Sequence, residues 1–320
     1  MQKGNILITI CFCLLLSAVV IPGWNIVREH KASTPKEKNS NTAASADNTG
    51  ETKKNTKEVP TEEEEQETVS LIQADGKTLQ KRILTPEGYE RTKAKENSLG
   101  NFIRNYPMKK DGSSVLLYNG QKKGNQNAHV AVFKLPIENE DLQQCADSVM
   151  RMYGEYYYQR GDYDKISFSL GNGFEANFRK WSNGNTIGFD GTNFYWMSSS
   201  KNDSSYPSFQ KFMRIVFAYA GTMTLEEESH KISLNKIRIG DIFIKGGSPG
   251  HVVMVVDRCK NAEGQKAFLL AQGYMPAQEF HVLKNPLHEK DPWYYTDEIT
   301  YPFVTPEYTF QQGSLRRPDY

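Results

Sequence analysis

The chain has 320 residues, of which 39 are basic and 38 acidic, and its formal net charge is +1. This balance provides no electrostatic basis for binding nucleic acid or an anionic surface. The mean hydropathy of −0.63 is low for a chain that is globular throughout, which points to a long polar stretch.

The first predicted segment, residues 1–28, is a signal peptide or a signal anchor. Lys3 precedes an apolar run from Ile6 to Ile21, which is long for a signal-peptide core and slightly short for a membrane span. Both alternatives predict an exported protein. It is either secreted or anchored at the cell surface, with membrane contact through this segment only.

Residues 29–70 are rich in Lys, Glu, Asn, Thr and Ser, contain no aromatic residue and include the acidic run Glu62–Glu65. Such a segment cannot bury enough apolar surface to offset the entropy lost on ordering, so it is predicted to be a disordered tether. Residues 71–320 hold nearly all of the aromatic side chains. We therefore expect them to form a single folded domain.

Two main helices are predicted in this domain. Apolar residues at steps of three and four predict the first over Asn139–Tyr158, with Asn139 as its N-cap and Cys145 on its apolar stripe. The same kind of stripe predicts a second helix over Ser208–Tyr219, with Gly221 as its stop signal.

The remaining elements are predicted to be strands of an antiparallel sheet, which gives an α+β fold class. A type I′ hairpin is predicted around Asn172-Gly173, and the aromatic-rich tail, Trp293–Tyr320, is predicted to wrap the domain surface. The other predicted strands are Val115–Tyr118, His129–Leu135, Ile242–Ile244, a strand that opens at His251, Ala267–Ala271 and Glu279–Leu283.

The stretch Ile239–Asp257 is the part of the domain most typical of a functional site. A short apolar strand leads into a turn of glycines and Pro249, which gives the backbone special conformations and stiffness. His251 then opens a strand of β-branched residues. A titratable side chain at that position is unlike ordinary core packing, so His251 is a candidate site residue.

Two cysteines remain after Cys11 and Cys13 are set aside with the N-terminal apolar run: Cys145 and Cys259. They could form one disulfide bridge or stay as free thiols. A thiol nucleophile needs an imidazole to accept its proton and a third polar group to orient that imidazole. The candidate set is Cys145 as nucleophile, His251 as base and Gln272 as orienter, with Asp257 as a weaker candidate for the third group.

A cysteine on a helix, followed in a sheet by Gly240-Asp241 and Gly250-His251-Val252, resembles the NlpC/P60 and related papain-like hydrolases. This resemblance implies a papain-like architecture and the hydrolysis of an amide in a peptidoglycan peptide. It also implies that the cysteine is the nucleophile and the histidine the base. Two features depart from that pattern: Gln144 stands where an aspartate commonly precedes the nucleophile, and the predicted helix start places Cys145 in the second turn.

More of the chain, residues 71–320, resembles the bacterial family called domain of unknown function 4846. The matching stretches are Leu142–Asp147, the hairpin that contains His251, and Leu270–Gln278. This resemblance implies membership of a family and no particular activity.

Several alternatives stay open beside the thiol hydrolase. Cys145 could be a buried core residue, and the domain could then bind a wall component or another partner without catalysis, with Trp181, Trp196 and Trp293 offering stacking surfaces. The sequence Gly246–Gly250 matches the G-x-S-x-G pattern of serine hydrolases, but a strand follows it and Pro249 has no N–H to donate. A zinc site built from His129, His251 and His281 lacks a diagnostic spacing, so no metal or cofactor is predicted.

Overall fold

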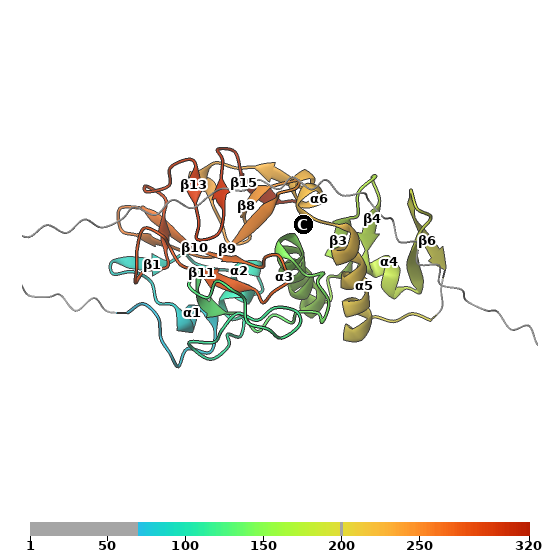
Figure 1. Cartoon of the computed structure of the whole chain (residues 1–320), viewed down its shortest axis with the longest axis horizontal. Coiled ribbons are helices and arrows are strands. Elements are labelled where there is room, and N and C mark those ends of the chain that lie inside the picture. Colours follow the sequence, from blue (N-terminus) through green and yellow to red (C-terminus); the bar gives the residue numbers. More distant parts are fainter. Residues whose placement is uncertain (1–69, 199–200) are drawn as a thin grey trace, which may run out of the picture. The chain divides into compact units, whose positions relative to one another are not determined.

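The computed structural model describes residues 70–198 and 201–320 (Figure 1). The predicted signal segment and the predicted tether, except Ser70, lie outside the described residues. Within the described ranges no helix is both long and apolar enough to cross a membrane.

The helices are α1 (Leu79–Arg82), α2 (Leu99–Arg104), α3 (Cys145–Arg160), α4 (Phe178–Ser182), α5 (Tyr206–Tyr219) and α6 (Thr222–Glu227), with 3₁₀ turns at Tyr163–Lys165 and Leu234–Lys236. The strands are β1 (Tyr89–Arg91), β2 (His129–Val132), β3 (Ser167–Ser169), β4 (Glu175–Asn177), β5 (Asn185–Phe189), β6 (Phe194–Ser198), β7 (Ser229–Lys231), β8 (Ile242–Lys245), β9 (His251–Asn261), β10 (Lys266–Gln272), β11 (His281–Leu283), β12 (Tyr294–Tyr295), β13 (Phe303–Val304), β14 (Thr309–Phe310) and β15 (Leu315–Pro318).

A nine-stranded sheet organises the domain. Its main path runs β2-β11-β10-β9-β8-β15-β7, and β1 and β12 pair at the far ends of β9 and β10. Every pairing is antiparallel. Together with the helices, this sheet confirms the predicted α+β class.

Strand β9 lies at the centre of the sheet and is buried on both faces. Val252, Met254 and Val256 pack into the cluster that contains α3, while Val253 and Val255 pack into a second cluster on the opposite face. Helix α3 packs against β9 on one side and against α5 on the other (Figure 1). Because side chains alternate along a strand, a strand covered on both faces needs apolar residues on both, as the run Val252–Val256 of β9 provides.

The start of the first long helix differs from the prediction. We expected an N-cap at Asn139, but α3 begins at Cys145, with Gln144 as the N-cap. The backbone N–H of Gln144 donates to the Asp147 carboxylate at 3.0 Å. Upstream, Asp141 accepts a 2.6 Å hydrogen bond from the distant N–H of Ala277, so its carboxylate holds a loop instead of a first helical turn.

Three further local predictions, a hairpin, a helix stop and a strand, can be compared with the structure. The hairpin at Asn172-Gly173 is confirmed, since both residues have positive φ values of 49° and 72° between β3 and β4. Gly221 is the N-cap of α6 and not the end of α5, which stops at Tyr219. The segment Val115–Tyr118 forms only isolated bridges.

The predicted surface position of the C-terminal tail is wrong at both ends of the tail, although Tyr301 and Val304 in its middle are exposed. Strand β15 pairs with β8 and β7 inside the main sheet, and Trp293 is fully buried. Arg317 makes a two-pronged ion pair with the buried Asp241, at 2.7 and 2.9 Å. Proline and aromatic content without periodicity therefore does not predict that a segment lies on the surface.

Candidate functional site

Cys145 is the first residue of α3, where backbone N–H groups have no partner within the helix. Its thiol lies against the N–H groups of Ala146 and Val252, and Val252 directly follows His251. Burial raises the pKa of the Cys145 thiol to about 11, Asp147 adds to this rise, and the N–H groups oppose it. The helix start therefore removes one departure from the papain-like pattern, since the cysteine sits in the first turn.

Close packing fixes the first turn of α3 against the end of β10. A Cβ on Gly273, the residue after Gln272, would lie 2.3 Å from the Ser148 hydroxyl and 2.8 Å from the Gln144 carbonyl oxygen. Only a glycine permits this approach, because real Cβ atoms do not come so near. The sequence therefore brings the cysteine of the helix and the glutamine of the sheet to the same region.

His251 is the first residue of β9, as predicted, and it is only 2% exposed. Its ring packs against Tyr274, with centroids 4.6 Å apart, and against Tyr308, at 5.0 Å. Burial lowers the pKa of His251 to about 4, and Lys123 adds to this fall, whereas the hydrogen bond to Gln272 opposes it. The imidazole is therefore neutral at pH 7.

Gln272 ends β10 and lies beside the imidazole, at the position expected of an orienting group. The distance from its Oε1 to Nε2 of His251 is 2.8 Å. Its Nε2 donates to Glu307 at 2.7 Å and lies 3.4 Å from Nε2 of His281. The structure thus joins two of the three candidate residues through a direct hydrogen bond.

Cys145 has no direct hydrogen bond to His251. The two residues share neighbours instead: burial raises the pKa values of Tyr274 and Tyr308, and the Cys145 thiolate adds to both rises. No described residue hydrogen-bonds Nδ1 of His251. His251 alternates with Val252, which faces α3, and its ring packs on Tyr308 and Phe310 of the other cluster, so the thiol and the imidazole share aromatic neighbours without a hydrogen bond between them.

A cavity of about 360 Å³ lies beside the thiol. It is lined by the start of α3, the end of α5, the start of α6, Met275 and the turn that precedes His251. Cys145 itself is only 5% exposed. The cavity therefore offers a route to a thiol that is otherwise covered.

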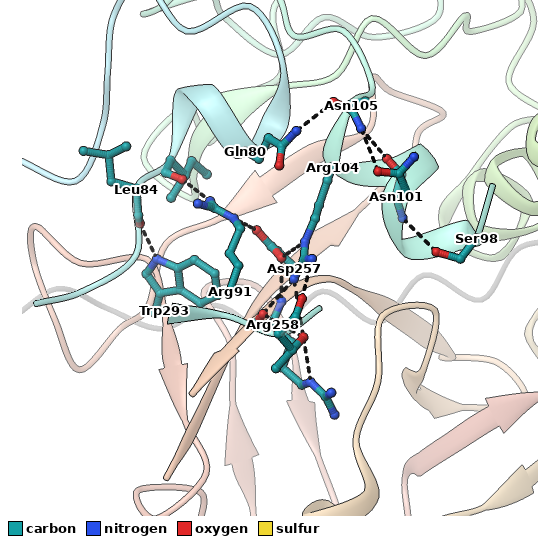
Figure 2. Close-up of polar contacts among 12 residues, drawn as sticks. Gln80, Leu84, Arg91, Ser98, Asn101, Arg104, Asn105, Asp257, Arg258 and Trp293 are labelled. Carbon is teal, nitrogen blue, oxygen red and sulfur yellow. Dashed lines mark hydrogen bonds and ion pairs between the residues drawn. The ribbon is translucent and has the colours of Figure 1, made fainter. Parts of the chain in front are cut away.

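Asp257, the weaker candidate for the orienting group, has a different role. It lies six residues after His251 on β9, about 20 Å along the strand at 3.3 Å per residue. Figure 2 shows its carboxylate held by Arg91 and Arg104, at 2.7 and 2.6 Å. It is fully buried, so its carboxylate ties β1 and α2 to the sheet.

Both described cysteines are free thiols. Cys259 pairs with Arg91 and Ala267 at the far end of β9, seven residues beyond the Val252 N–H that faces Cys145. At 3.3 Å per residue this is a separation of about 23 Å, far beyond the reach of a disulfide. The alternative of a Cys145–Cys259 bridge is therefore wrong for this fold.

Two further alternatives from the sequence are the histidine zinc site and the serine hydrolase. His129 and His281 pack edge to face, with centroids 5.8 Å apart, but within the described ranges no group of three or more His, Cys, Asp or Glu side chains could hold a metal ion. Ser248 lies in the turn that leads into β9, not into a helix. The serine-hydrolase geometry is therefore missing.

Sequence reasoning did not find four residues that surround the His251–Gln272 pair: Lys123, Glu307, Tyr274 and Tyr308. Lys123 lies between the predicted strands Val115–Tyr118 and His129–Leu135 and Glu307 lies in the predicted tail, and neither position carries a local signal. Tyr274 lies in a stretch that was matched to a family, without a role. These residues come together only through the tertiary structure.

These features define the class of protein. It is an α+β domain whose central antiparallel strands present a buried histidine and glutamine, next to a helix that begins at a cysteine. The chain belongs to the family described as "Domain of unknown function (4846)", which residues 79–317 match. No curated protein and no solved structure matches the chain.

Proposed function

We propose that the chain is an exported cell-envelope protein that hydrolyses an amide bond of a cell-wall peptide with a thiol nucleophile, on a papain-like architecture of the NlpC/P60 type. Cys145 is the nucleophile, His251 the base and Gln272 its orienting group. The hydrogen bond between His251 and Gln272, at 2.8 Å beside a helix that begins with Cys145, carries the proposal. Export, and attachment through the N-terminal segment, rest on the sequence alone.

The arrangement supports a balanced reaction. The Cys145 thiol gives its proton to Nδ1 of His251 as sulfur bonds to the amide carbon, and the imidazolium then protonates the departing amine. Water, deprotonated by the same nitrogen, attacks the resulting thioester, which releases the acid and restores the thiol. The N–H groups of Cys145 and Ala146 at the start of α3 can stabilise the oxyanion.

A second candidate function is supported by different observations. The thiol and the imidazole are both buried, and they are not hydrogen-bonded to each other. A larger cavity, of about 550 Å³, lies instead at the far end of α3 and is lined by Asn101, Asn105, Gln159, Phe102 and Tyr156, among others. Amide and aromatic side chains suit polar ligands with apolar faces, so the alternative is a non-catalytic domain that binds a wall component or another partner.

The rate of thiol alkylation separates these functions. In the full-length protein, iodoacetamide labelling at Cys145 and Cys259 is followed by mass spectrometry from pH 5 to pH 9. Cys259 is an internal control for a fully buried thiol, whose pKa burial raises to about 12; because Cys145 lies beside a cavity, the pH profile and not the rate ratio alone identifies assistance by His251. A thiol assisted by His251 reacts faster than Cys259 and depends weakly on pH above about 5, where the imidazole is neutral.

An unassisted thiol with a pKa of about 11 instead reacts about tenfold faster per pH unit, since only the thiolate is nucleophilic. That profile, with no advantage over Cys259, would rule out the thiol hydrolase. Activity is then tested on purified peptidoglycan by the appearance of new amino groups. Wild-type protein should release them, and Cys145→Ser should lower the release at least 100-fold.

A further inference from the structure

The carboxamide of Gln272 has two chemically different ends, and its surroundings determine which end faces His251. Glu307 is a carboxylate, which accepts hydrogen bonds and cannot donate them when ionised. The end of Gln272 at 2.7 Å from Glu307 must therefore be the NH₂ group, as the structure has it. This places Oε1 against His251, so Nε2 of the imidazole must carry the proton.

His281 supports the same orientation. Its Nδ1 lies 2.8 Å from the carbonyl oxygen of Glu279, so this nitrogen donates and its Nε2 is left as an acceptor. That acceptor lies 3.4 Å from the NH₂ group of Gln272. His281 is fully buried, and burial, together with Lys123, keeps its pKa well below the ordinary value. Glu307 and Nε2 of His281 are therefore both acceptors, and both require the NH₂ end of the Gln272 carboxamide to face them.

Glu307 is itself held by two groups from a distant loop. Lys123 forms an ion pair with its Oε2, and Asn125 donates to its Oε1 at 3.2 Å. The Lys123 and Glu307 side chains are only 7% and 11% exposed. Lys123 also lies 6.0 Å from the Tyr274 ring centroid. Buried ion pairs are costly to desolvate, and the same Oε2 of Glu307 that pairs with Lys123 also accepts the NH₂ group of Gln272.

We propose that the Lys123–Glu307 ion pair is the positioning element of the site: through Gln272 it holds His251 in the tautomer that is protonated at Nε2, which leaves Nδ1 to accept the thiol proton. The catalytic role of this tautomer rests on the proposed function, whereas the tautomer itself can be measured independently. Without the Glu307 carboxylate, the Gln272 carboxamide can rotate by 180° and present NH₂ to His251. The imidazole would then accept at Nε2, carry its proton at Nδ1 and have no lone pair for the thiol.

The test reads the tautomer directly by ¹⁵N NMR of histidine-labelled full-length protein at pH 7, with the His251 signal identified from H251Q. Wild-type protein should show the Nε2–H form. The double variant K123M/E307L removes both charges together, which avoids an unpaired buried lysine and favours folding. This variant should show a mixture of tautomers or the Nδ1–H form. The rate of Cys145 alkylation should fall by one to two orders of magnitude, which is part of the roughly 10²–10⁴-fold rate acceleration that a positioned base contributes.

Two further variants separate positioning from general destabilisation. E307Q can still offer a carbonyl oxygen to Gln272, so it should keep the Nε2–H form and most of the alkylation rate. E298L removes a surface carboxylate that lies 2.8 Å from His288, and it should leave the His251 signal unchanged. A wild-type Nδ1–H form, or an unchanged Nε2–H form in K123M/E307L, would overturn the inference. If wild-type Cys145 is no faster than Cys259 while the tautomer still shifts, only the proposed function fails.

Discussion

Replacing Asp257 with Asn should destabilise the domain strongly without changing the chemistry of Cys145. The carboxylate is fully buried, accepts from Arg91 and Arg104 at 2.7 and 2.6 Å, and accepts the Arg258 N–H at 2.8 Å (Figure 2). Breaking a buried pair by removing one charge costs about 3–5 kcal/mol, because the partner charge is left uncompensated. For a domain of this size, that corresponds to a fall in Tm of about 6–20 °C.

Thermal unfolding and urea denaturation of the full-length protein measure this effect. The matched control is Asp164→Asn, whose carboxylate is 76% exposed and lies 3.3 Å from Arg179. Exposed pairs contribute about 0–1 kcal/mol, so this control should stay near wild type. A D257N protein within 1 kcal/mol of wild type would refute the ion-pair argument. Slower Cys145 alkylation in folded D257N would mean that Asp257 contributes to the site after all.

Two further predictions concern a carboxyl group and a glycine. Burial raises the pKa of Glu228 from 4.5 to about 7. Between these pH values the folded state holds a proton that the unfolded state has lost, so the free energy of unfolding should fall as the pH rises from 4.5 to 7. The expected fall is about 1–2 kcal/mol after allowance for solvent screening. Denaturation across that range should show a larger fall in wild type than in E228Q, and parallel curves for the two proteins would contradict it. Gly240 has φ of 98°, and a Cβ there would lie 2.7 Å from the Tyr153 hydroxyl, so G240A should be destabilised by about 2–4 kcal/mol. The control G88A (φ 74°), with no atom within 4 Å of the added Cβ, should lose only about 1–2 kcal/mol, and equal losses in a denaturant titration would disprove the steric argument.

Predictions from the sequence succeeded where a local pattern determines the structure. The period of the apolar residues located both long helices, and the β-branched run after His251 predicted β9 with its first residue correct. The start of α3 was wrong because Asp141 bonds a backbone N–H 136 residues away. The pairing of β15 with β8 and the contact of Glu307 with Gln272 also join residues that are far apart in sequence. Such contacts leave no periodic signal in one sequence.

Burial alone does not distinguish a catalytic histidine from a structural one in this protein. The aromatic rings and polar groups that orient His251 also cover it, and they keep it neutral in either case. His281 provides the comparison, because it is equally buried but has a partner for each ring nitrogen, the Glu279 carbonyl at Nδ1 and Gln272 at Nε2. A structural histidine normally has its polar atoms satisfied in this way.

His251 differs from His281 at one atom. Its Nε2 is bonded to Gln272, while no described residue hydrogen-bonds its Nδ1, and the thiol of Cys145 lies against the next residue of the same strand. An ordered carboxamide that fixes the proton on Nε2 has a chemical consequence only if the lone pair on Nδ1 is used. In the proposed reaction that lone pair accepts the thiol proton of Cys145, which is the step that the Nε2–H tautomer makes possible.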